Sequence, residues 1–135
     1  MFKIEKAENR HTDFWMSLDR HISPEQLKLK ISLHECFIII SGNELCGILR
    51  YGLFWDNTPF LNMIYIQEDF RGRGFGRHAV ISWETEMASQ GYEMVMTSSL
   101  SDESAQHFYR KLGYRDAGCL FMPDEAAEII FIKNI

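Results

Sequence analysis

The sequence has few cysteines, no long apolar segment and no excess of basic residues. Its three cysteines, Cys36, Cys46 and Cys119, are odd in number and widely separated, which indicates neither a disulfide framework nor a paired metal site. Their apolar surroundings favour buried free thiols. No segment approaches the length needed to cross a bilayer, and the charged N-terminus lacks the apolar core of a secretion signal. We therefore expect a cytoplasmic protein without a metal and without a membrane partner.

The net charge of -5 at neutral pH argues against nucleic acid as a partner. Basic residues gather in one place only, the segment Arg71–Arg77. A net negative charge agrees better with a cationic amine as the substrate. Linkers, repeats and low-complexity tracts are also missing, and 135 residues suffice for a single domain with its own core. We expect that domain to span residues 1–135.

Short apolar segments typical of strands alternate along the chain with segments whose apolar residues have helical spacing. Ser23 followed by Pro24 is a typical helix start, and Gly91 and Gly113 stand where helices typically end. Thr12 or Asp13 can cap an earlier helix. The pattern predicts strands over residues 2–7, 35–41, 44–55, 61–66, 92–97, 114–121 and 128–133. It predicts helices after residue 12, over 24–34 with Leu27, Ile31 and His34 on one face, over 74–90, and over 105–112 after a cap at Ser101-Asp102-Glu103.

The most informative stretch is Leu61–Gly76. An apolar strand is followed by Arg71–Gly76, which opens the helix predicted over residues 74–90. Its three glycines let the backbone approach a ligand closely, and the first N–H groups of a helix have no intrahelical partner. Arg71, Arg73 and Arg77 add positive charge. The stretch therefore predicts a phosphate or pyrophosphate site, with a tight turn and solvated arginines as the alternative.

The glycine spacing matches neither the dinucleotide fingerprint nor the nucleotide phosphate loop. Strand, glycine turn, helix and strand nevertheless follow one another, which predicts a βαβ unit with parallel strands. Ligands bind at the carboxyl ends of such strands, where the glycine turn lies.

Two motifs resemble those of one known family. Arg71–Gly76 reads R-x-x-G-x-G after a strand and before a helix, which resembles the acetyl-coenzyme A signature of the GNAT N-acetyltransferase superfamily. Ser104–Tyr114 resembles the A-x-x-F-Y-x-K-x-G-F/Y helix of the same enzymes. The resemblance implies an α/β fold with a mixed sheet of about seven strands, mostly antiparallel with a parallel pair at the cofactor cleft, and about four helices.

The resemblance also implies roles for individual residues. The turn and Arg77 would hold the pyrophosphate of acetyl-CoA, the end of the preceding strand would bind the pantetheine arm and polarise the thioester carbonyl, and Tyr109 would protonate the departing thiolate. The residues assigned to acetyl-CoA in this way are Ile64, Tyr65, Ile66, Arg71, Gly72, Arg73, Gly74, Phe75, Gly76, Arg77, Asp102, Ala105 and Phe108.

Asp102 departs from the family pattern. The family usually has an asparagine there whose side chain touches the pantetheine, and an aspartate loses the amide donor. Capping the following helix is the simpler role for Asp102. Tyr109 likewise has an alternative role as a core residue on the apolar stripe. As an acid it is suitable, because a phenol with a reference pKa of about 10 keeps its proton at neutral pH.

The implied function is N-acetyl transfer by direct attack of a primary amine on acetyl-CoA in a ternary complex. A small-molecule acceptor is favoured, and a protein amino group is the alternative. Phe54, Trp55 and Phe60 surround the turn where an acceptor could be recognised, but core packing or a dimer interface explains them equally well. A non-catalytic acetyl-CoA sensor and a nucleotide-binding protein are the other function classes. No base is assigned; the candidates are His34, Glu35, Asp56 and His107.

Overall fold

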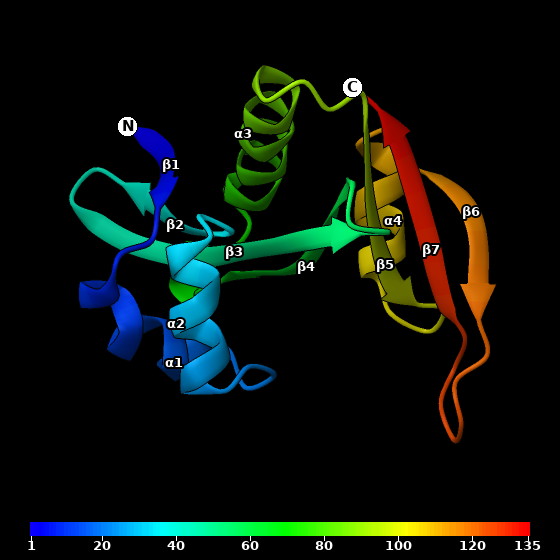
Figure 1. Cartoon of the computed structure of the whole chain (residues 1–135), viewed down its shortest axis with the longest axis horizontal. Helices are drawn as coiled ribbons and strands as arrows, with labels where there is room; N and C mark the ends of the chain where they lie inside the picture. Colours follow the sequence, from blue (N-terminus) through cyan, green and yellow to red (C-terminus); the bar gives the residue numbers. More distant parts are fainter. The chain divides into compact units, whose positions relative to one another are not determined.

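The order of helices and strands follows the sequence pattern. The computed structural model describes the whole chain, Met1–Ile135 (Figure 1). Its strands are β1 (Phe2–Lys6), β2 (Cys36–Ser41), β3 (Glu44–Phe54), β4 (Thr58–Ile66), β5 (Met94–Leu100), β6 (Arg115–Leu120) and β7 (Glu128–Asn134). Its helices are α1 (Thr12–Leu18), α2 (Pro24–Ser32), α3 (Phe75–Ser89) and α4 (Ala105–Lys111), with 3-10 turns η1 (Asn9–His11) and η2 (Glu68–Phe70).

The seven strands form one mixed sheet in the order β1-β2-β3-β4-β5-β7-β6. β4 and β5 pair in parallel, with Phe60 opposite Met96 and Leu61 opposite Thr97. The pairs β1–β2, β2–β3, β5–β7 and β6–β7 are antiparallel. The expected fold class, a mostly antiparallel seven-stranded sheet with one parallel pair and four helices, is confirmed.

Packing divides the chain into two compact units. Unit 1 comprises Met1–Tyr51 and Met63–Trp83, and unit 2 comprises Gly52–Asn62 and Glu84–Ile135. Each has fully buried apolar side chains of its own. None of the helices is long and apolar enough to cross a membrane.

In unit 1, the helices α1 and α2 pack on the sheet. Trp15 and Leu27 are fully buried against Ile38 and Ile48 from β2 and β3. Ser23 caps α2 as expected, since its hydroxyl accepts a hydrogen bond from the Gln26 N–H at 3.2 Å and Pro24 takes the first helical position.

A buried carboxylate closes the end of α1. Asp19 is fully buried and accepts hydrogen bonds from Trp15 Nε1 (3.1 Å), the His21 N–H (3.0 Å) and Arg50 Nε (2.8 Å). Burial alone raises the pKa of a carboxyl, but the hydrogen bonds from Arg50, His21 and Trp15 outweigh it and hold the pKa of Asp19 below its ordinary value. Asp19 thereby ties α1 to β3.

In unit 2, helices cover one face of the β5-β7-β6 sheet. Glu84, near the middle of α3, accepts hydrogen bonds from the Tyr114 hydroxyl (2.7 Å) and Lys133 Nζ (2.8 Å), and α4 packs on β5. Lys133 and Phe131 therefore face the helices. Because side chains alternate along a strand, Ile130 faces the opposite side.

Several predicted ends of helices and strands differ from those in the structure. α1 begins at Thr12 with His11 as its N-cap, and neither Thr12 nor Asp13 caps it, because η1 leads directly into the helix. His34 lies beyond the end of α2 with a positive φ of 59° instead of sharing its buried face. β5 begins at Met94 rather than Tyr92 and continues to Leu100, since it pairs with β7 along its whole length.

The expectation for the cysteines holds for two of the three. Cys36 and Cys46 are buried free thiols in unit 1, whereas Cys119 is exposed. Cys119 lies on β6, an edge strand whose residues are all exposed. An apolar run alone does not distinguish an edge strand from a central one.

Candidate functional site

The glycine turn in unit 1 presents a run of free main-chain donors. Gly72 and Gly74 have positive φ angles of 76° and 81°, a conformation that favours glycine. The first main-chain hydrogen bond of α3 joins the His78 N–H to the Gly74 carbonyl at 3.0 Å. The N–H groups of residues 72–77 donate to no acceptor in the protein. They lie at the positive end of the helix dipole and are suited to an anion.

The arginines of the turn form no ion pair with a carboxylate. Arg71 Nε donates to the Ile66 carbonyl at 2.8 Å, and its guanidinium lies 5.0 Å from the centre of the Tyr65 ring. The Arg73 guanidinium lies 5.6 Å from the Phe70 ring centre. Together with the exposed Arg77, these side chains keep an uncompensated positive charge beside the free N–H groups.

Aromatic packing holds the turn in place. The Phe75 ring stacks on Phe2 with 5.7 Å between ring centres and lies 6.2 Å from Phe70, and His78 meets Phe2 edge-on at 5.5 Å. Phe75 therefore anchors the first turn of α3 through its side chain. Its main-chain N–H remains one of the free donors.

The end of β4 depends on a glycine that the sequence reasoning missed. A Cβ atom at Gly47 in β3 would overlap the carbonyl oxygen of Tyr65. The Gln67 N–H donates to the Cys46 carbonyl at 2.8 Å, which fixes the same region. Any side chain at Gly47 would displace the backbone at Tyr65 and Ile66. The available signal was a glycine inside an apolar strand, which often marks close backbone approach.

Tyr109 lies in unit 2 and is buried, with 6% of its surface exposed. Its ring packs against Phe131, and its hydroxyl is hydrogen-bonded to Thr97. Thr97 Oγ1 in turn donates to the Leu61 carbonyl of β4 at 3.0 Å. Burial raises the pKa of Tyr109 above its ordinary value, and the bond to Thr97 offsets this only in part. The phenol therefore keeps its proton at neutral pH.

The residues preceding Tyr109 are arranged differently from the expectation. Ala105 begins α4 and Phe108 is half-buried, with its ring centre 5.2 Å from that of Tyr109. The N-cap of α4 is Ser104 and has no side-chain cap, so the expected capping by Asp102 is wrong. Asp102 is exposed in a turn before the helix. Gln106 holds that turn instead, by donating to the Ser101 and Glu103 carbonyls.

The candidate bases do not form a cluster around either group. Glu35 pairs with Lys30 Nζ at 3.1 Å. His34, Asp56 and His107 are exposed. None of the four is therefore placed to act as a base.

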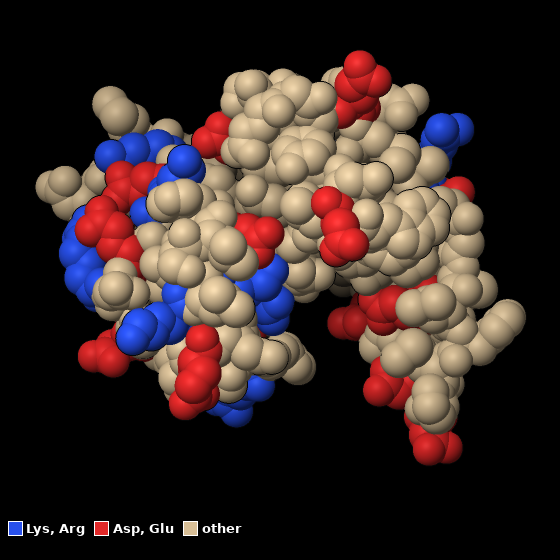
Figure 2. All heavy atoms as spheres, viewed as in Figure 1, with Lys and Arg blue, Asp and Glu red and all other residues tan.

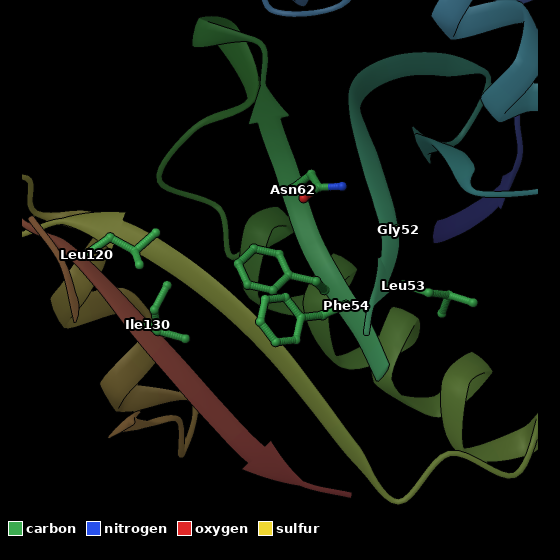
Figure 3. A pocket seen from close by; sticks show the side chains of 7 residues that line it. Gly52, Leu53, Phe54, Asn62, Leu120 and Ile130 are labelled. Carbon is green, nitrogen blue, oxygen red and sulfur yellow. The ribbon is translucent and has the colours of Figure 1, made fainter. Parts of the chain in front are cut away.

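Unit 2 also contains an apolar cavity of about 310 Å³. Figure 3 shows Phe54 from the end of β3, Asn62 from β4, Leu120 from β6 and Ile130 from β7 around it. The ring centres of Phe54 and Phe60 lie 6.0 Å apart. The full lining is Gly52, Leu53, Phe54, Phe60, Asn62, Leu120 and Ile130. The sequence pointed to the two phenylalanines, but the contributions of β6 and β7 follow only from strand pairing.

A second, polar hollow of about 270 Å³ lies in unit 1. It is lined by Leu18, Tyr65, Gln67, Glu68 and Asp69. The end of β4 and the residues that follow it are therefore accessible.

The turn in unit 1 has the groups of an anion site. Residues 72–77 offer main-chain donors without partners, and the arginines offer positive charge that no carboxylate pairs with. These are the groups that bind phosphates at helix N-termini elsewhere.

Comparison with known proteins gives a consistent result. The family model described as the acetyltransferase (GNAT) family matches residues 4–114. Among curated proteins, none matches the sequence closely enough to count as a relative.

Several solved structures share the fold. An acetyltransferase of the GNAT family from Bacillus cereus is 26% identical with a TM-score of 0.80, covering 99% of this chain and 97% of its own. The PaiA N-acetyltransferase from Thermoplasma acidophilum, solved in complex with coenzyme A, is 14% identical with a TM-score of 0.83, covering 100% and 99%. The ribosomal-protein-S18-alanine N-acetyltransferase from Escherichia coli is 15% identical with a TM-score of 0.80, covering 100% and 94%.

The family match extends over most of the chain and includes both motifs, the glycine turn and the α4 helix. The chain therefore belongs to the GNAT family and is an acetyl-CoA-dependent acetyltransferase.

Proposed function

We propose that the chain is a single N-acetyltransferase domain that moves the acetyl group of acetyl-CoA to the primary amine of a small molecule. The observation that carries the proposal is the run of free N–H groups at residues 72–77 beside three arginines without carboxylate partners. That arrangement binds a diphosphate. The family match, which runs through residues of both units, supports one domain over residues 1–135.

The cosubstrate contacts follow from the turn. Gly72, Gly74 and Gly76 bring the main chain close to the pyrophosphate, and Arg71, Arg73, Phe75 and Arg77 complete the turn around it. The main chain of Ile64, Tyr65 and Ile66 binds the pantetheine arm and polarises the thioester carbonyl, which stabilises the oxyanion that develops there. Ala105 and Phe108 line the arm from α4. Asp102 is exposed and not engaged in capping, so it is free to make the pantetheine contact.

The reaction is direct transfer. The amine nitrogen attacks the thioester carbonyl carbon, and the new C–N bond gives a tetrahedral centre. As this centre collapses, the C–S bond breaks, and Tyr109 gives its proton to the departing thiolate. The amine loses one proton to solvent, and solvent reprotonates Tyr109. Burial keeps Tyr109 protonated until this step.

Calorimetry and a thiol-release assay test the proposal together. We expect acetyl-CoA to bind, and free thiol to appear only when a primary amine is present. Binding without amine-dependent thiol release from any of a broad panel of amines would favour the sensor. A protein acetyltransferase would instead acetylate peptide N-termini and leave small amines untouched.

Thermal shift with competing ligands separates the nucleotide-binding alternative. A ligand that binds only the folded state raises the melting temperature. We expect coenzyme A to raise it and ATP at the same concentration to do so far less. A larger shift with ATP would contradict the proposal.

A further inference from the structure

Within unit 2, the helices cover only one face of the sheet. Phe131 and Lys133 on β7 face α4 and α3, as their contacts with Tyr109 and Glu84 show. Side chains alternate along a strand, so Glu128 and Ile130 face the other way. The cavity of about 310 Å³ lies on that open face, since Ile130 lines it.

The open face combines an apolar floor with polar side chains that have no partner. Phe54, Phe60 and Ile130 form the floor. Asn62 lines the cavity, and its amide makes no hydrogen bond in the protein. Glu128 pairs across the sheet with Leu120, another lining residue. Directly opposed side chains are neighbours on one face, so Glu128 is on the same face as the cavity, next to Leu120.

The Glu128 carboxylate forms no hydrogen bond and no ion pair, although it is half-buried. A carboxylate without a partner in the protein is available to a cationic ligand. Unit 2 as a whole has ten acidic and four basic side chains. Figure 2 shows acidic side chains, and no basic ones, at the tip between β6 and β7. The charge at this tip therefore favours a cation.

The volume of the cavity limits the size of that cation. A space of about 310 Å³ is at the lower end of small-molecule sites and is suited to a compact group. The apolar floor is suited to a compact hydrocarbon or aromatic group, and Glu128 and Asn62 are suited to an ammonium.

The position of the cavity connects it with the reaction. Asn62 lies two residues before Ile64 on β4, the strand proposed to hold the thioester. Its neighbour Leu61 accepts the hydrogen bond from Thr97, which is itself bonded to Tyr109. The cavity and the proposed acid thus lie on opposite faces of the same β4–β5 pair.

We propose, on the basis of the acetyltransferase function above, that this cavity binds the acceptor, a small primary amine with a compact apolar or aromatic substituent. The substituent packs on Phe54, Phe60 and Ile130. Glu128 receives the ammonium, and Asn62 orients it. Proton release to solvent gives the neutral amine that attacks.

A panel of amines tests the substrate class. Thiol release is measured at saturating acetyl-CoA with 2-phenylethylamine, isoamylamine, ethanolamine and putrescine. Each buried methylene contributes a few-fold, so we expect kcat/KM for the first two to exceed that for the last two by about tenfold or more. Equal values, or a preference for ethanolamine or putrescine, would overturn the proposal.

Matched variants test the residues. Glu128→Gln is expected to raise KM for 2-phenylethylamine about tenfold, because a charge-assisted contact is lost. Leu120→Ser changes a side chain that is 55% exposed and is expected to reduce the preference for apolar amines. Glu125→Gln removes the same charge from the exposed loop before β7 and serves as the control. The proposal is wrong if Glu125→Gln has the same effect as Glu128→Gln, or if Glu128→Gln has none.

The two proposals can fail separately. If calorimetry detects no acetyl-CoA binding, the proposed function fails. If acetyl-CoA binds and some amine is acetylated without the apolar preference, only the acceptor assignment fails. Light scattering adds an independent outcome, since a dimer that Leu120→Ser dissociates would assign the face to a second copy of the chain and overturn the assignment.

Discussion

The two units differ in charge and in what they expose. Unit 1 has ten basic and nine acidic side chains, whereas unit 2 has four basic and ten acidic ones. Unit 1 contains the free N–H groups and the arginines of the glycine turn, and unit 2 contains Tyr109 and the apolar cavity. The acidic balance of the whole chain therefore belongs to unit 2 alone.

This difference suits a reaction between an anionic cosubstrate and a cationic acceptor. A diphosphate is attracted to the unit with free positive charge, and an ammonium to the unit with excess negative charge. Net charge computed over the whole chain hides this separation.

The largest effect is expected from the buried carboxylate of unit 1. Asp19→Ala leaves the Arg50 side chain, only 12% exposed, without its anionic partner, and removing one member of a buried pair costs about 3–5 kcal/mol. Urea unfolding measures the loss. The exposed pair Glu8–Arg10 provides the control, because Glu8→Ala breaks an ion pair that water already screens. Equal losses in the two variants would contradict this account.

The next effect concerns catalysis in unit 2. Tyr109→Phe keeps the ring packing and removes the proton donor, so kcat should fall about 100-fold while the Kd for acetyl-CoA stays unchanged. Tyr92→Phe removes a hydroxyl outside the proposed site and should leave kcat unaltered. If Tyr109→Phe retains full activity, Tyr109 is a core residue and not the acid.

A smaller effect is expected from the turn of unit 1. Gly74→Ala places a Cβ at a φ of 81°, which costs about 1–2 kcal/mol and displaces the main-chain donors. The Kd for acetyl-CoA, measured by calorimetry, should rise about tenfold. Gly42→Ala imposes similar strain at a φ of 62° in the hairpin between β2 and β3 and should leave the Kd unchanged. An equal loss of affinity in both would point to general destabilisation.

Lowering the pH should reduce the stability of unit 1, because Asp19 becomes protonated. Its folded pKa lies below the ordinary value of 3.8, so its contribution to stability is fully present above pH 3.8 and is lost as pH falls through the folded pKa. Urea unfolding at pH 5 and pH 3 measures the fall in the free energy of unfolding. Asp19→Asn should make that fall smaller. An unchanged pH dependence in the variant would assign the effect to other carboxyls.

The smallest expected effect concerns the reactivity of the cysteine thiols, which should differ between the two units. Cys36 and Cys46 of unit 1 are buried, and burial raises the pKa of Cys36 to about 12, whereas Cys119 of unit 2 is exposed. A thiol reagent should label one cysteine in the native protein and all three in urea. Cys119→Ser should abolish native labelling. Rapid labelling of a second thiol without urea would show that unit 1 opens.

Local chemistry explains what could be predicted at the turn. Glycine tolerates positive φ and helix N-termini lack intrahelical acceptors, so Arg71–Gly76 could be predicted as a candidate anion site, with a tight turn as the alternative. Ser23 with Pro24, and the glycines after α3 and α4, were predictable for the same reason. Asp102 was misjudged because capping depends on where the helix begins, and α4 begins only at Ala105.

The sequence by itself determined the order of strands and helices, the glycine turn and the motif helix with Tyr109, because each depends on residues close together in the chain. Only the tertiary structure decided the rest. The overlap that excludes a side chain at Gly47, the exposure of Cys119 and the grouping of Phe60, Leu120 and Ile130 around one cavity all depend on which strands are neighbours. Strand pairing joins residues far apart in sequence, and the apolar alternation that forms a strand does not specify its partner.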